Sequence, residues 1–253
     1  RIEGQDIAHL NFGTSSAQTV TLSFYIRSNK TGNTSVALLN SDNNRAYVAT
    51  FTIDSANTWE RKKITIAGDQ SGTWLDTNGI GLRLRWGSFG STAQTSSVNQ
   101  WQANQVMSTN SSPINFFDST DNELYLTGVQ LEVGEQATPF EHRSFGEELA
   151  LCQRYFKRIE VGNNIRISTS AFADTTTRAR FVIYHNPEMR STPTVAETNL
   201  DLGGTDINAI ATTGSTDLND VIITRGSGSH STGDILDVHQ GSNTATLDFA
   251  AEL

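Results

Sequence analysis

The sequence predicts an all-β protein that consists of a jelly-roll β-sandwich, a short helical junction and a smaller C-terminal β-sandwich. Three observations support this prediction. Several segments alternate apolar and polar residues with a period of two, as strands with one buried face do. The segments between them are rich in Asn, Asp and Gly, which tolerate left-handed turn geometry. Hydrophobic residues make up only 36% of the 253 residues, which favours short strands joined by polar turns over a helical bundle.

Residues 1–142 are expected to form the jelly roll. The clearest strand is VTLSFYIRS at residues 20–28, in which an apolar residue stands at every second position. Further strands are expected at residues 35–40, 45–54, 61–68, 79–89 and 124–133. Strands of this kind need one face in a core and one in water, and two antiparallel sheets stacked face to face provide both.

Residues 143–158 are expected to form a helical junction between the two domains. Ser144 and Glu147 have the spacing of a capping box, in which each residue's side chain bonds the other's backbone N–H. Three residues behind this cap recur at helical spacing and are expected to be buried between the domains: Leu149, Cys152 and Phe156.

Residues 159–253 are expected to form the smaller β-sandwich. Candidate strands lie at residues 164–172, 178–185, 193–198, 220–225, 234–240 and 244–250. This region is rich in small polar residues, so a lone copy buries little apolar area. We therefore expect much of its stability to come from contacts with identical copies or with the jelly roll.

Charge and composition exclude several classes of protein. The formal net charge of −9 argues against nucleic-acid binding, which relies on basic patches. No apolar run reaches the length of a membrane span, so we expect neither a signal peptide nor membrane insertion. A single cysteine excludes an internal disulfide framework and a cysteine-based metal cluster. The chain opens without Met, so a longer parent polypeptide is expected.

Enzyme motifs are missing from the sequence, and no catalytic residue is assigned. It has no G-x-S-x-G, no H-E-x-x-H and no phosphate loop, and its five histidines are scattered. A glycosidase needs two carboxylates about 5–9 Å apart across a sugar. Nothing in the sequence marks Glu132, in the last strand of the jelly roll, as buried or paired. We expect no enzyme, with a polysaccharide depolymerase subdomain as an open alternative.

Several segments resemble one known family. TGVQLEVGEQATPFEHRSFGEELALCQRYF at residues 127–156 resembles a junction of bacteriophage tail-fibre and tail-spike proteins, especially those of marine phages. RIEGQDIAHL, VTLSFYIRSNKTG and FTIDSANTWERKKITIAGD resemble the N-terminal jelly roll of that family, and HNPEMRSTPTV resembles a turn in its C-terminal unit. The resemblance covers the first 195 residues. It implies a jelly roll similar to carbohydrate-binding modules and contact with bacterial surface glycans.

The function expected from this resemblance is non-enzymatic recognition of a host-surface glycan by a tail-fibre or tail-spike module. Its implied partners are the host cell-surface glycan and other phage tail proteins, and a fibre segment is expected to be a homo-trimer. Its location would be the tail appendage of the virion, after synthesis in the bacterial host cytoplasm. The alternative is a purely structural or trimerising fibre module that binds no sugar.

Sugar sites combine flat aromatic rings with planar hydrogen-bonding groups. The candidate glycan-binding residues are Tyr25, Arg27, Arg83, Arg85, Phe89 and Trp101. The first four stand opposite the apolar positions of their strands, where they form either an ordinary solvated face or a concave binding face with Phe89 at its rim. Trp101 lies in a long polar stretch, as a loop anchor or as a sugar platform.

The remaining tryptophans are assigned to the interior of the jelly roll. Trp86 shares the parity of the apolar residues in its strand and is expected in the core, whereas Trp59 and Trp74 stand beside turns and are expected to close the ends of the sandwich. Each lies close to a segment with strand periodicity. None of the three is therefore a first candidate for sugar contact.

No cofactor is expected, except for a structural calcium ion at one acidic loop. The sequence DSTDNE offers three carboxylates as oxygen ligands: Asp118, Asp121 and Glu123. Several carbohydrate-binding jelly rolls carry such an ion. The alternative is a solvated hairpin turn without metal.

Overall fold

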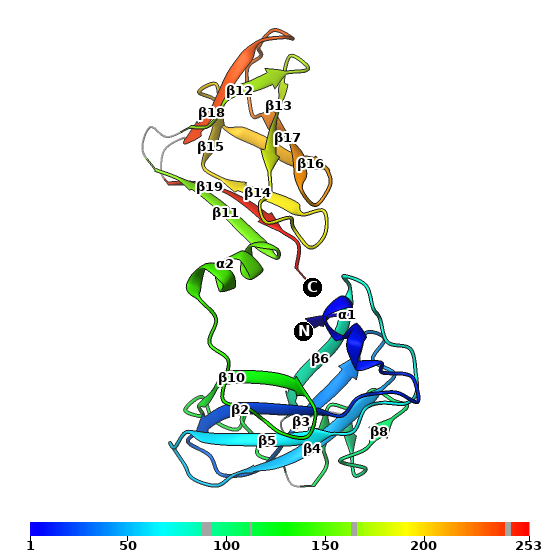
Figure 1. The fold of residues 1–253 in the computed structure, drawn as a ribbon. Helices are drawn as coiled ribbons and strands as arrows, with labels where there is room; N and C mark the ends of the chain where they lie inside the picture. Colours follow the sequence, from blue (N-terminus) through cyan, green and yellow to red (C-terminus); the bar gives the residue numbers. More distant parts are fainter. Residues whose placement is uncertain (88–92, 112, 163–165, 241–243, 253) are drawn as a thin grey trace. The chain divides into compact units, whose positions relative to one another are not determined.

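The computed structural model describes residues 1–87, 93–111, 113–162, 166–240 and 244–252. The chain divides into two compact units, Arg1–His142 and Arg143–Glu252 (Figure 1). Each unit is built from packed sheets of antiparallel strands, which confirms the predicted all-β sandwich fold. Among the described residues, no helix is long and apolar enough to cross a membrane.

The first unit contains a five-stranded sheet in the order β1-β6-β3-β4-β8 and a three-stranded sheet in the order β10-β2-β5. Their strands are β1 (Ile2–Glu3), β2 (Val20–Ser28), β3 (Gly32–Asn40), β4 (Ala46–Ile53), β5 (Glu60–Ile66), β6 (Ile80–Gly87), β8 (Trp101–Gln102) and β10 (Leu124–Val133). The predicted strands correspond to the six longest of these. The short elements were not predicted: α1 (Gly4–Ile7), η1 (Ala8–Leu10), β1, β8 and the parallel pair β7 (Gln94–Thr95) and β9 (Ser108–Thr109).

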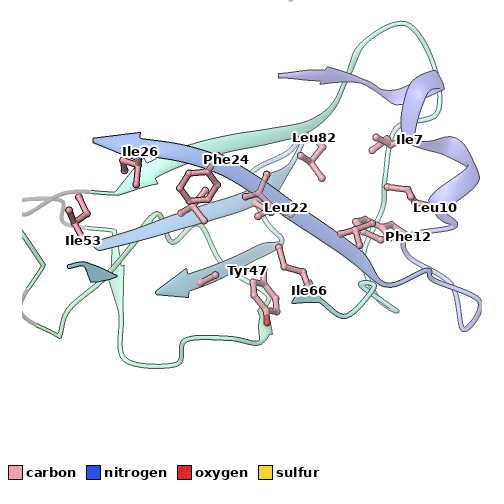
Figure 2. Close-up of a cluster of buried hydrophobic side chains, with 14 of the residues drawn as sticks. Ile7, Leu10, Phe12, Leu22, Phe24, Ile26, Tyr47, Ile53, Ile66 and Leu82 are labelled. Atoms are coloured by element: carbon pink, nitrogen blue, oxygen red, sulfur yellow. The ribbon is translucent and has the colours of Figure 1, made fainter. Parts of the chain in front are cut away.

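The core of this unit lies between its two sheets. The alternating apolar residues of β2 point inward, and Phe24 is fully buried among them (Figure 2). Its ring meets those of Phe51 and Trp86 edge-on, with centroids 5.1 and 5.8 Å away. Edge-to-face pairs of this kind add about 0.5–1.5 kcal/mol beyond the area that they bury. The core position predicted for Trp86 is confirmed.

A second apolar layer covers the outer face of the five-stranded sheet. Ala37, Leu39, Ala46 and Val48 form a separate buried cluster with Val106, and Val98 and Met107 pack against it. The segment between β7 and β9 supplies these three last residues. Consequently β3 and β4 are buried on both faces along much of their length, and this side of the sandwich is not an open surface.

The second unit is also a sandwich of two sheets. Its three-stranded sheet has the order β11-β19-β14, and its six-stranded sheet has the order β15-β18-β12-β13-β17-β16. The strands are β11 (Phe156–Val161), β12 (Arg166–Ala173), β13 (Arg178–Tyr184), β14 (Thr194–Thr198), β15 (Leu200–Leu202), β16 (Ile207–Gly214), β17 (Leu218–Arg225), β18 (Ile235–Gln240) and β19 (Ala245–Ala250). A core that includes Phe181, Leu247 and Phe249 lies between the sheets. The sequence did not predict β11, β15 or β16.

The predicted helix is confirmed as α2 (Phe145–Gln153), and so is its capping box. The Glu147 backbone N–H donates to Ser144 Oγ at 3.3 Å, and the Ser144 N–H donates to Glu147 Oε2 at 3.0 Å. The three residues that were expected to be buried behind this cap are not buried within the second unit. Leu149 and Cys152 are exposed, and Phe156 opens β11 with 41% of its surface exposed. The helix ends before Phe156, so the helical spacing that linked the three residues does not hold.

Candidate functional site

The residues predicted to converge on one ligand lie on two different sheets. Tyr25 and Arg27 belong to β2 in the three-stranded sheet, whereas Arg83 and Arg85 belong to β6 in the five-stranded sheet. The two sheets pack through their inner faces, so side chains that point away from the core on each sheet point in opposite directions. The predicted convergence is therefore wrong. Alternation shows which residues point outward, but not the sheet to which a strand belongs.

Arg83 and Arg85 bond to segments of the first unit itself. Arg83 Nη1 donates to the Ser41 carbonyl oxygen at 2.6 Å and to Asn43 Oδ1 at 2.8 Å. Arg85 Nη1 lies 2.7 Å from the sulfur of Met107, which packs on the second apolar layer. Burial, together with the charge of Arg85, lowers the pKa of Arg83 from its ordinary value. These contacts favour a structural role for both arginines.

Trp101 packs into a cluster of aromatic rings at the core. Its ring lies edge-on to Phe12, Tyr47 and Trp74, with centroids 5.8, 5.4 and 5.4 Å away. Its Nε1 donates to the Ala67 carbonyl oxygen at 2.7 Å. This arrangement favours the loop anchor over the sugar platform. Phe89, the proposed rim residue, lies outside the described residues.

The acidic loop does not bring its three carboxylates together. Lys30 Nζ donates to both carboxylate oxygens of Asp118, at 2.8 and 2.7 Å. The Asn29 side chain donates to the backbone carbonyl of Asp121 and accepts from the backbone N–H of Glu123. Among the described residues, no group of three His, Cys, Asp or Glu side chains could hold a metal ion. A lysine ammonium thus neutralises one of the three carboxylates that the calcium hypothesis needs.

The outer face of the three-stranded sheet carries a set of exposed rings and cations. In the central strand β2, Tyr25 pairs with Arg61 of β5, and Arg27 pairs with Tyr125 of β10. Trp59, immediately before β5, lies beside Tyr125, with ring centroids 6.5 Å apart. The exposed fractions of Tyr25, Trp59 and Tyr125 are 37%, 46% and 44%, so all three rings are open to solvent. We call these five residues the aromatic face.

Each guanidinium of the aromatic face lies over a neighbouring ring. The Arg27 Cζ atom lies 5.6 Å from the Tyr125 ring centroid, and Arg61 Cζ lies 5.9 Å from that of Tyr25. Exposed cation–π pairs of this kind contribute about 0.5–1 kcal/mol each. Arg27 Nε also donates to the Asn57 carbonyl oxygen at 3.1 Å, and Arg61 Nη2 donates to the Thr138 carbonyl. These bonds orient both groups and use one of the five N–H donors of each guanidinium.

The segment 134–141 crosses the other half of the same outer face. Thr21 Oγ1 donates to the Gly134 carbonyl oxygen at 2.7 Å, and Thr21 is only 1% exposed. The Glu141 backbone N–H donates to Gln130 Oε1 at 2.8 Å. The sheet face is therefore covered at the Thr21 end and open at the Arg27 end, where the aromatic face lies.

Glu132, considered above for catalysis, belongs to the covered half. Its Oε1 accepts from the Thr138 hydroxyl at 2.5 Å, and its Oε2 accepts from the Thr138 backbone N–H at 3.1 Å. The bond from the Thr138 side chain is the main cause that lowers the pKa of Glu132. A general acid needs a raised pKa, so this environment is opposite to the one that acid catalysis requires.

Sequence reasoning missed three members of the aromatic face: Trp59, Arg61 and Tyr125. Tyr125 alternates with Leu124 and Leu126, and that alternation is a signal that could have placed it on the outer face. Trp59 was expected to close an end of the sandwich, but its exposed fraction of 46% contradicts that assignment. Only the pairing of β5, β2 and β10 brings these residues beside Tyr25 and Arg27.

Comparison with known proteins does not assign the chain to a family. No protein-family model matches the chain, and no curated protein matches it. Among solved structures, a chain of Red Clover Necrotic Mosaic Virus aligns over 92% of this chain and 74% of its own length, with 13% sequence identity and a TM-score of 0.12. A likeness at that TM-score carries no argument about fold or function. The resemblance to phage tail fibres stays a prediction from the sequence.

Proposed function

We propose that this chain is a module of a bacteriophage tail fibre or tail spike that recognises a host-surface glycan without catalysis, and that the aromatic face binds the sugar. The observation that carries the proposal is the presence of three exposed rings and two oriented arginines on the outer face of one sheet. Large exposed aromatic patches mark interaction sites more often than isolated exposed residues do. The sequence resemblance supplies the biological setting, with the virion tail as location and other tail proteins as partners.

The chemistry of the aromatic face suits a saccharide. The apolar face of a pyranose ring can stack on Tyr25, Trp59 or Tyr125, and guanidinium N–H groups can donate to its oxygens. Such an open surface excludes little water, so we expect a single module to bind weakly, at about −4 to −8 kcal/mol. Several copies on one fibre would raise the avidity by roughly 10²- to 10⁴-fold without a new contact.

Binding of the full chain to a glycan array tests this function. We expect Tyr125→Ala to abolish most of the signal, because it removes a ring and the surface on which Arg27 lies. Phe117→Ala is the matched control, since Phe117 is an aromatic residue of the same unit, is 83% exposed and lies outside the aromatic face. Equal binding by both variants and the wild type would show that the glycan-binding site lies outside the aromatic face. Release of reducing sugar from a bound polysaccharide would favour the depolymerase alternative.

A second candidate function, fibre assembly, is favoured by an apolar surface in the second unit. The outer face of its six-stranded sheet exposes Phe172, Val182, Tyr184 and Ile235. Arg180, on the same face, bonds to Asp174 and Asp220 of its own chain, so the nearby charges are already neutralised. Such a surface suits a second copy of this chain, in a homo-trimer.

The assembly proposal is tested by light scattering of the full chain. We expect a trimer that Val182→Asp converts to monomers, because the substitution places a charge in an apolar contact. Thr198→Asp, at an exposed polar position of β14 in the other sheet, is the control and should leave the trimer intact. A wild-type chain that is monomeric at all concentrations would exclude this role.

A further inference from the structure

The aromatic face concentrates cations that have no carboxylate partner. Lys63 of β5 is exposed and has the same outward parity as Arg61, so it adds a third cation, beside the aromatic face, to Arg27 and Arg61. Within the described part of the chain, no Asp or Glu side chain forms a salt bridge with any of them. The chain has 27 acids against 18 Lys and Arg, so unpaired cations gathered on one face run against its overall charge.

Three other cations of the same unit have carboxylate partners, whereas Arg83 and Arg85 bond to uncharged groups. Lys30 bonds to Asp118, Arg45 bonds to Asp69, and Lys62 bonds to both Asp54 and Glu60. Lys62 is the direct neighbour of Arg61 and Lys63 in β5 but has the opposite parity. Within this one strand, the cation that points to one side of the sheet forms salt bridges with carboxylates, and the two that point to the other side form none with the described residues.

Among the described residues, the acids beside the aromatic face form no salt bridge with its cations, although the charge of Arg61 contributes to the lowered pKa of Glu132. Glu132 gives its two oxygens to the backbone N–H and the hydroxyl of Thr138. Glu123 has the parity of Tyr125 but precedes the first residue of β10, at the border of the face. The charged groups of the open half are thus donors only, since guanidinium and ammonium groups have no acceptor.

We propose that the aromatic face selects an acidic saccharide, whose carboxylate, sulfate or phosphate group binds between Arg27 and Arg61 while a sugar ring stacks on the tyrosines. This inference rests on the proposed glycan-binding function and specifies its ligand. A neutral sugar presents hydroxyls that both donate and accept, so it needs acceptors as well as donors from the protein. An anionic group accepts only, which matches the charged groups of this face, and a guanidinium can bind it through two parallel N–H bonds.

The positions of the two arginines suit one anionic group. Tyr25 pairs directly with Arg61, and Arg27 lies two residues further along β2, so the arginines are diagonal neighbours across adjacent strands. The backbones of such neighbours are about 7–8 Å apart, a distance that two long side chains can bridge from both sides. Tyr25 lies beside both, where a sugar that carries the anion would meet a ring.

The test measures binding of the full chain to an array of acidic and neutral glycans. Each bound acidic glycan is then compared with its carboxyl-reduced, desulfated or dephosphorylated counterpart, which also identifies the anionic group. We expect removal of the anion to weaken binding by about tenfold or more, as the loss of a charge-assisted hydrogen bond does. Raising the salt concentration from about 0.05 to about 0.5 M should weaken binding of the acidic glycan and leave any neutral one unchanged.

Variants separate this inference from the function on which it rests. Arg27→Gln and Arg61→Gln should each lower affinity for the acidic glycan about tenfold, Arg27→Lys should retain part of it, and the exposed Arg143→Gln serves as control. Melting temperatures check that the variants are folded. Suppose that the chain binds neutral glycans and that this binding depends on Tyr125 but not on the arginines. This result would overturn the proposed selectivity for acidic saccharides, but the proposed glycan-binding function would stand. Acidic binding that survives both Gln substitutions would also overturn this selectivity, and an array without any bound glycan would overturn both proposals.

Discussion

Replacing Trp101 by Ala should destabilise the first unit without removing a ligand contact. The indole makes three edge-on ring contacts in the cluster around Phe12 and donates one hydrogen bond, to Ala67. Truncation of a core Phe or Trp to Ala costs about 3–5 kcal/mol. Because Trp101 is only half-buried, we expect the lower end of that range, about 3 kcal/mol. For a unit of this size that loss lowers the melting temperature by about 6–12 °C.

Tryptophan fluorescence can follow this unit alone, because all four tryptophans precede residue 143. Trp59→Ala is the paired variant, since Trp59 is a member of the aromatic face and is 46% exposed. We expect Trp101→Ala to lose stability and keep glycan binding below its melting temperature, and Trp59→Ala to show the reverse. A Trp101→Ala variant with unchanged stability and lost binding would refute the anchor role and restore the sugar platform.

Three further predictions concern other parts of the chain. Asp174→Asn should cost about 1 kcal/mol at neutral pH, because Arg178 and Arg180 lower the pKa of Asp174 to about 2 but solvent screens part of that interaction. Since the folded pKa lies below the ordinary value, this stability is present above about pH 4 and disappears as the pH falls towards 2 in wild-type melting curves, but not in the variant. Phe156→Ala should cost less than about 2 kcal/mol, because the ring is exposed, and a loss of about 3–5 kcal/mol in denaturant titrations would show that it is buried in solution. Calcium at about 1 mM should leave the melting temperature unchanged, because Lys30 occupies the carboxylate of Asp118; a rise would contradict this assignment.

Sequence periodicity was sufficient to predict the positions of the long strands. It was not sufficient to predict which residues lie together in the candidate site. The alternation in β2 correctly placed Tyr25 and Arg27 on an outer face, because side chains of a strand alternate between two sides. The same reasoning placed Arg85 on an outer face, but of the other sheet. Whether two strands share a sheet depends on pairing between residues far apart in the sequence, which alternation along one strand does not encode.

Residues in short or irregular segments were the hardest to assign. Trp101 lies in a two-residue strand within a polar stretch. Hydrophobic periodicity therefore could not predict its contacts with Tyr47 and Trp74. Phe156 continued the helical spacing of α2, yet it pairs with Ala250 as the first residue of β11. In both cases long-range pairing determined the local structure, and such tertiary preference overrides local pattern.

Amide chemical-shift mapping of the full chain with a glycan identified on the array tests the central claim most directly. We predict shift changes that centre on the open half of the β10-β2-β5 sheet, at Tyr25, Arg27, Arg61 and Tyr125. Tyr125→Ala should remove them, and Phe117→Ala should retain them. Changes centred on β6, in the opposite sheet, or in the second unit would contradict the assignment of the aromatic face as the glycan-binding site.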